Sequence, residues 1–118
     1  MEFEEKLNEM YQEIANKISE MIPAEWEKIY TKAYINDEGG EVIFNYTTPG
    51  SDDLHYYTDI PTDYNVSEEI FYDLWKNLYK SFERLRVLFM KNNQEPWTSC
   101  EFDFTKEGKL NVSFDYIE

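Results

Sequence analysis

Two stretches of the chain space their apolar residues as an amphipathic α-helix requires. Over residues 2–22 the apolar positions recur in steps of three and four, which places them on one helical face. Pro23 should end this helix, because a proline disfavours helical backbone in the residue before it. Ser67 is a suitable N-cap for a second helix, which should end near Asn92. The residues expected on its buried face are Ile70, Phe71, Leu74, Trp75, Leu78, Phe82, Leu85 and Phe89.

The last 22 residues alternate apolar and polar positions instead, which predicts a β-hairpin. Gly108 lies in the short linker between the two strands, where a hairpin turn needs a positive φ. Three apolar pairs should face each other on the buried side, namely Phe104 with Leu110, Phe102 with Val112 and Cys100 with Phe114. The opposite side should be a solvated acidic surface that carries Glu101, Asp103 and Asp115.

A second hairpin is predicted in the middle of the chain. Residues 25–35 and 41–47 are rich in β-branched and aromatic side chains and flank a glycine-containing turn. After a loop at residues 48–53, we expect a short strand over residues 55–59 and another loop over residues 60–65. The order is therefore helix, three strands, helix and two strands. Short connections favour an α+β fold, in which a mostly antiparallel sheet of about five strands carries two long helices on one face.

Composition and charge narrow the classes of partner. The chain of 118 residues suits a single domain, residues 1–118, and 18% of it is aromatic, which is enough for a substantial core. The net charge of −14 disfavours nucleic acid and anionic membranes as partners and favours basic proteins. One cysteine excludes an internal disulfide, and no apolar run reaches the length of a membrane span. The acidic start of the chain is unlike a signal peptide, so we expect a cytoplasmic protein.

The acidic residues are unevenly distributed along the chain. Between Lys32 and Lys76 there is no lysine or arginine, but this interval holds ten acidic residues and six tyrosines. Carboxylates attract and pair with the lysines or arginines of a partner, and tyrosines add rigid contact area with a hydrogen-bonding end. The interval therefore suits the binding of a basic protein. The alternative is an ordinary solvated surface whose tyrosines pack half-buried.

No set of residues predicts catalysis. His55 is the only histidine, and its acidic neighbours do not follow a metal-binding spacing. Cys100 alternates in phase with core residues and should be a buried, unreactive thiol. Glu101 and Asp103 lie two residues apart on an exposed strand, where nothing should drive their pKa values apart. We therefore expect no enzyme activity, no catalytic residues, no cofactor and no metal site.

Five segments, taken together and in order, resemble the YezG-type immunity proteins. They are residues 22–30 (IPAEWEKIY), 39–46 (GGEVIFNY), 49–54 (PGSDDL), 71–75 (FYDLW) and 95–104 (EPWTSCEFDF). The resemblance spans essentially the whole chain. It implies an antitoxin that binds and neutralises the nuclease domain of a toxin exported by a type VII secretion system. It carries over no catalytic residues, so it indicates a role and a partner rather than a site.

The residues that we expect to contact such a partner form two groups. The favoured group, here called the central acidic segment, consists of Asp52, Asp53, Tyr56, Tyr57, Asp59 and Asp63. The second group, here called the sheet-face acids, consists of Glu101, Asp103 and Asp115. Either group would compete with nucleic acid for the basic surface of a nuclease. The alternative function is a non-enzymatic scaffold or regulatory domain that binds another basic protein or self-associates, because open sheet edges also allow a homodimer.

Overall fold

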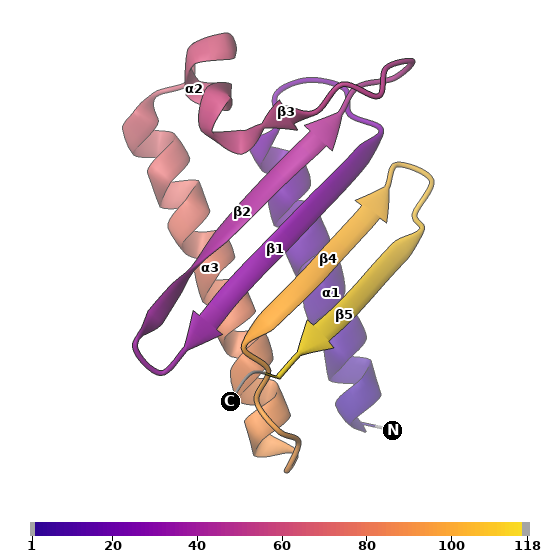
Figure 1. Cartoon of the computed structure of the whole chain (residues 1–118), viewed down its shortest axis with the longest axis vertical. Coiled ribbons are helices and arrows are strands. Elements are labelled where there is room, and N and C mark those ends of the chain that lie inside the picture. Colours follow the sequence, from indigo (N-terminus) through magenta and orange to yellow (C-terminus); the bar gives the residue numbers. More distant parts are fainter. Residues whose placement is uncertain (1, 117–118) are drawn as a thin grey trace.

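The computed structural model describes residues 2–116, which form a five-stranded antiparallel sheet with two long helices packed on one face (Figure 1). The strand order is β3-β2-β1-β4-β5. In chain order the elements are α1 (Glu2–Met21), β1 (Lys28–Asn36), β2 (Gly39–Thr47), β3 (His55–Tyr56), the 3₁₀ helix η1 (Tyr57–Asp59), α2 (Ile60–Asp63), α3 (Glu68–Lys91), β4 (Ser99–Thr105) and β5 (Leu110–Asp115). This arrangement confirms the predicted α+β class. Within residues 2–116, no helix combines the length and the apolar character that crossing a bilayer requires.

Both long helices keep close to their predicted limits. Ser67 caps α3, because its hydroxyl oxygen accepts a hydrogen bond from the Ile70 N–H at 3.4 Å. The buried side chains of α3 are those of Phe71, Leu78, Ser81, Phe82, Leu85 and Phe89. The side chain of Ile70 is 57% exposed, so the prediction that it is buried is wrong. Ile70 precedes Phe71 by one residue, about 100° around the helix, and therefore points away from the core.

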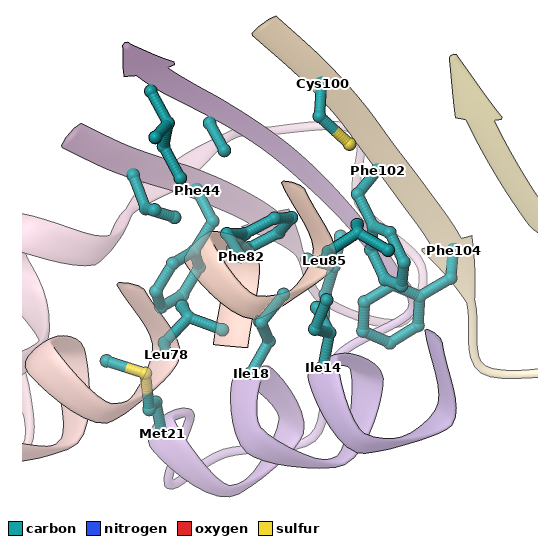
Figure 2. Packing of buried hydrophobic residues seen from close by; sticks show 14 of the residues in the cluster. Ile14, Ile18, Met21, Phe44, Leu78, Phe82, Leu85, Cys100, Phe102 and Phe104 are labelled. Carbon is teal, nitrogen blue, oxygen red and sulfur yellow. The ribbon is translucent and has the colours of Figure 1, made fainter. Parts of the chain in front are cut away.

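The core lies between the two long helices and the sheet (Figure 2). Phe102 of β4 is fully buried and makes edge-to-face contacts with Tyr11 of α1 and Phe82 of α3, with ring centroids 5.8 and 6.0 Å apart. It thereby joins the sheet to both helices. Cys100, two residues before it on the same face of β4, is also fully buried, as predicted. Burial raises the pKa of this thiol, which keeps it protonated and unreactive.

The two predicted hairpins combine into one sheet through β1. The hairpin of β4 and β5 has the predicted register, with Phe104 opposite Leu110, Phe102 opposite Val112 and Cys100 opposite Phe114. β1 is the central strand and pairs with β2 on one side and β4 on the other. At the β1–β2 turn, a Cβ atom on Gly40 would lie 1.8 Å from the Tyr34 carbonyl oxygen. Glycine at this position therefore permits the close approach of the two backbones.

The segment between β2 and α3 differs from the prediction. β3 is only two residues long, and η1 and the short helix α2 follow it, where a longer strand and a loop were expected. Pro61 lies in the first turn of α2, where its missing N–H costs no helical hydrogen bond. Ile60 is fully buried, and its carbonyl oxygen accepts a hydrogen bond from the Tyr64 N–H at 3.0 Å. Burial of this one side chain holds the segment against the core as a helical turn, and no local periodicity reveals it.

Candidate protein-binding surfaces

Among residues 2–116, no helix covers the face of the sheet that lies away from α1 and α3 (Figure 1). Alternation along β1 buries Ile29 and Ala33 completely on the helix side. It turns Tyr30 and Tyr34 to the uncovered side, where they are 40% and 39% exposed. The uncovered face is therefore a broad and partly aromatic surface. The sequence placed Tyr34 among the tyrosines of the acidic interval, but neither tyrosine was included in the two groups of expected contact residues, although the alternation of β1 indicates their direction.

The sheet-face acids all lie on this uncovered face. The register sets Asp115 opposite Ser99, whose hydroxyl group donates to the carboxylate at 3.5 Å. Glu101 and Asp103 follow Ser99 at alternate positions along β4, so they point to the same side. The structure thus brings the three predicted carboxylates onto one surface. Their role in binding stays a prediction.

A lysine interrupts this acidic surface. Lys32 of β1 lies directly opposite Glu101 of β4, and its ammonium group is 5.3 Å from the centroid of the Tyr34 ring. The pKa of Lys32 is raised, chiefly by a hydrogen bond to the Tyr34 side chain and also by the carboxylates of Glu101 and Asp115. The uncovered face is therefore a mixed surface of acids, tyrosines and a central cation, rather than the purely acidic surface that we expected.

The two carboxylates of β4 are not equivalent. Asp103 is partly buried, and one of its carboxylate oxygens accepts a hydrogen bond from the Thr31 N–H at 3.2 Å. Burial raises the pKa of Asp103, the Thr31 hydrogen bond opposes this rise, and the charge of Glu101 adds to it. Glu101 itself is exposed. The expectation that nothing distinguishes the two groups is therefore wrong, because Asp103 is partly buried and hydrogen-bonded to β1 whereas Glu101 is exposed.

Replacing Asp103 with asparagine should raise the free energy of unfolding at neutral pH by a few tenths of a kcal/mol, a small value because the side chain is partly exposed. Asparagine keeps an oxygen for the Thr31 N–H but has no charge to desolvate. Because folding raises the pKa of Asp103, the ionised group destabilises the fold above its folded pKa, and this penalty vanishes below its unfolded pKa, near 4. Urea unfolding across this pH range should show the advantage of the variant disappearing on acidification.

Glu13 provides a control of opposite sign. Despite partial burial, the hydrogen bond from Ser81 and the charges of Arg84 and Lys17 lower the pKa of Glu13. Its ionised form therefore stabilises the fold above its unfolded pKa, and this contribution is lost as the pH falls through the folded pKa. Glu13→Gln should be less stable than the natural chain at neutral pH, with a difference that shrinks on acidification. Parallel pH profiles for the two variants would contradict both assignments.

The central acidic segment follows the edge of the sheet beside β2. Asp52 and Asp53 are exposed in the loop before β3, and Asp59 and Asp63 are exposed on η1 and α2. Burial, a hydrogen bond to Tyr64 and the charges of Asp63 and Asp59 raise the pKa of Tyr46. Asp59 and Asp63 therefore both lie near Tyr46. All four carboxylates are accessible to a partner.

The two adjacent tyrosines of the central acidic segment point to opposite sides. Tyr56 pairs with Asn45 of β2, so its half-exposed side chain shares the uncovered face of the sheet. Tyr57 turns towards the helix side, where its ring lies 5.3 Å from that of Phe44. The predicted group is therefore divided between two surfaces, because adjacent residues along the edge of a sheet point to opposite faces.

Tyr57 contributes to an open groove between η1, α2 and the first turns of α3. This feature, here called the aromatic groove, has a volume of about 530 Å³ and is lined by Tyr57, Thr58, Pro61, Glu68, Phe71, Tyr72 and Trp75. The Trp75 Nε1–H donates a hydrogen bond to the Val42 carbonyl oxygen at 2.8 Å, which fixes the indole against β2. The Tyr72 ring stacks nearly parallel to the indole, with centroids 6.1 Å apart. Sequence reasoning placed Trp75 in the core and did not foresee the groove.

The remaining candidate side chains have structural places. His55 stacks on Tyr46, with ring centroids 5.2 Å apart and an interplanar angle of 23°. Among residues 2–116, no three side chains of His, Cys, Asp or Glu converge as the ligands of a metal ion would. The surfaces described above therefore offer charge, aromatic area and hydrogen bonds, which are the means of contact between proteins.

The sequence profile of the family described as "Immunity protein YezG-like" matches residues 7–118 of the chain. The chain belongs to the YezG-like immunity protein family. This confirms the resemblance that the five sequence segments indicated.

Three relatives of this YezG-like chain are similar over most of its length. It is 68% identical to the type VII secretion system protein EsaG of Staphylococcus aureus (strain NCTC 8325 / PS 47) over 118 residues, which are 100% of this chain and 72% of that protein. It is 42% identical over 111 residues to the immunity protein YezG of Bacillus spizizenii, covering 94% of this chain and 69% of that protein. The immunity protein YezG of Bacillus subtilis (strain 168) is 36% identical over 110 residues, with coverages of 93% and 73%.

Proposed function

We propose that this chain is the immunity protein of a secreted bacterial toxin, and that it binds and neutralises the nuclease domain of that toxin in the cytoplasm of the producing cell. Membership of the YezG-like family supports the immunity role. The similarity to EsaG, a type VII secretion system protein, supports a toxin exported by that route. The chain acts by binding and catalyses no reaction of its own.

The observation that carries the nuclease assignment is the exposed acidic interval. No lysine or arginine occurs between Lys32 and Lys76, and the carboxylates of Asp52, Asp53 and Asp59 face solvent there. A nuclease needs lysines and arginines to hold phosphates, and an acidic protein is complementary to that surface. Occupying the surface is sufficient for inhibition, because nucleic acid then has no access to the catalytic groups.

Co-purification with the nuclease domain of a toxin encoded beside this chain tests the proposal. We expect a stable complex in which DNA degradation is abolished, and activity that returns when the complex is dissociated. An unrelated protein of similar net charge serves as the control for non-specific attraction, and it should neither co-purify nor inhibit at physiological salt. A complex that still degrades DNA would contradict the proposal. Absence of a complex with any neighbouring toxin would favour the alternative scaffold or regulatory function.

A further inference from the structure

The aromatic groove has a chemistry that selects its occupant. Its floor and walls are formed by the side chains of Phe71, Trp75, Tyr57 and Pro61, which are apolar or aromatic. Glu68 is the one charged residue among those that line it. The residues that line the groove come from η1, α2 and the first turns of α3. Figure 1 shows α2 beside the N-terminal end of α3. The volume of the groove, about 530 Å³, is within the range of clefts that hold small ligands or anchoring side chains.

The surroundings of the groove are negatively charged. Burial and the carboxylate of Glu41 raise the pKa of Tyr57, which places that acid on β2 within electrostatic reach of the groove. Glu69 and Asp73 are exposed on the same helix but do not line the groove. The nearest lysine along α3, Lys76, is already ion-paired with Asp73 at 3.4 Å. An occupant therefore needs an apolar stem and a cationic end.

A neighbouring contact shows that the Tyr72 ring at the groove accepts a cation. The Lys76 ammonium group lies 5.0 Å from the centroid of the Tyr72 ring, on a helix where Tyr72 and Trp75 are stacked. Arginine fits the groove better than lysine, because its planar guanidinium group stacks on aromatic rings and pairs with a carboxylate through two hydrogen bonds. Its three methylene groups can cover an apolar floor while the charge stays at the rim.

We propose that the aromatic groove receives an arginine side chain of the toxin, with the guanidinium group paired to Glu68 and the alkyl stem packed against the aromatic floor. The identity of the partner rests on the proposed function, whereas the preference for arginine rests on the groove itself. The groove would thus anchor one side chain of the toxin at the interface, and the acidic residues around the interface would attract the toxin towards it.

Affinity for the toxin nuclease domain tests the anchor. Glu68→Gln and Tyr72→Ala should each weaken the complex roughly tenfold, because each removes a charged or aromatic contact to the arginine. Glu69→Gln and Ile70→Ala are matched controls, since Glu69 carries the same charge in the same turn and Ile70 is as exposed as Tyr72, at 57%. Neither lines the groove, so both should bind within about twofold of the natural chain. Equal losses for Glu68→Gln and Glu69→Gln, or no loss in either, would overturn the proposal.

A double-mutant cycle identifies the arginine. Each arginine of the nuclease domain is replaced by glutamine, and its effect on affinity is measured with the natural chain and with Glu68→Gln. We expect one arginine whose replacement costs affinity in the natural chain but not in the variant. Independent effects at every arginine would overturn the assignment.

A titration without the toxin separates this inference from the proposed function. N-acetyl-arginine methylamide, added to the isotope-labelled chain, should shift the NMR signals of the Trp75 indole N–H and of residue 68. The glycine analogue should not shift them, and Glu68→Gln should reduce the response. If the natural chain binds no toxin but shows this response, the proposed function fails and the arginine preference of the groove stands. Absence of the response, or its replacement by self-association of the chain through the same residues, overturns the arginine preference.

Discussion

Replacing Phe102 with alanine should lower the free energy of unfolding by about 4 kcal/mol, a value within the usual range for deleting a buried aromatic ring. Phe102 is fully buried and contacts Tyr11 of α1, Phe82 of α3 and Phe104 of its own strand. Its removal would leave a cavity where the sheet meets both long helices, and the surrounding elements cannot close it without separating from one another. Since small domains are stable by about 5–15 kcal/mol, the variant should approach the limit of folding.

Chemical denaturation monitored by tryptophan fluorescence gives the measurement. Leu110→Ala is the control on the same hairpin, because Leu110 is 42% exposed and its truncation leaves no buried cavity. We expect that control to cost less than about 1 kcal/mol. Phe102→Leu should lie between the two, because leucine fills part of the space. A Phe102→Ala variant as stable as Leu110→Ala would show that Phe102 does not join the layers as described.

Reversing the charge of two acids in each acidic group should reduce affinity for the toxin nuclease domain by roughly a hundredfold or more, because close charge pairs and steering both contribute at such interfaces. Asp52→Lys with Asp53→Lys alone should mainly slow association, by roughly tenfold at low salt. Adding Glu101→Lys and Asp115→Lys should then remove the second group. Asp103 is left unchanged, because its carboxylate holds the Thr31 N–H and a reversal there would disturb the fold.

Association and dissociation rates, measured at two salt concentrations, check this result together with the DNA-degradation assay. The matched control carries Glu5→Lys and Glu9→Lys, which are exposed on α1 across the sheet from the sheet-face acids. It has the same change of net charge as the Asp52 and Asp53 pair, so it separates local contact from overall charge. If the fourfold variant still neutralised the toxin, neither acidic group would form the interface.

Much of the fold follows from periodicity in the sequence. The apolar steps of three and four predicted α1 and α3 to within a few residues, because each helix buries one continuous stripe. Alternation around Gly108 predicted the register of β4 and β5, because a shift of one residue would expose Phe102 and Phe104. The same register placed the sheet-face acids correctly on one surface.

Other features depend on contacts between distant segments, which periodicity does not report. The pairing of β1 with β4 brings Lys32 opposite Glu101, although the two residues are 69 positions apart along the chain. The aromatic groove likewise requires that η1 and α2 fold back beside α3. Burial of Ile60 fixes that arrangement, and the sequence around it reads as a loop because of its proline and polar residues. The alternation of β1 could have indicated that Tyr30 and Tyr34 share one face of the sheet. It could not have indicated which residues of the neighbouring strands lie beside them.

The hydrogen bond from Trp75 to Val42 has a consequence for behaviour at high concentration. Among residues 2–116, β3 pairs only with Asn45 and Tyr46 of β2, so the rest of β2 forms an outer edge of the sheet. Unpaired carbonyl groups on such an edge can template another chain and seed aggregates. The indole N–H of Trp75 occupies the Val42 carbonyl oxygen at 2.8 Å. A strand that paired at this point would have to displace the indole, so a single side chain from α3 opposes fibrous assembly there.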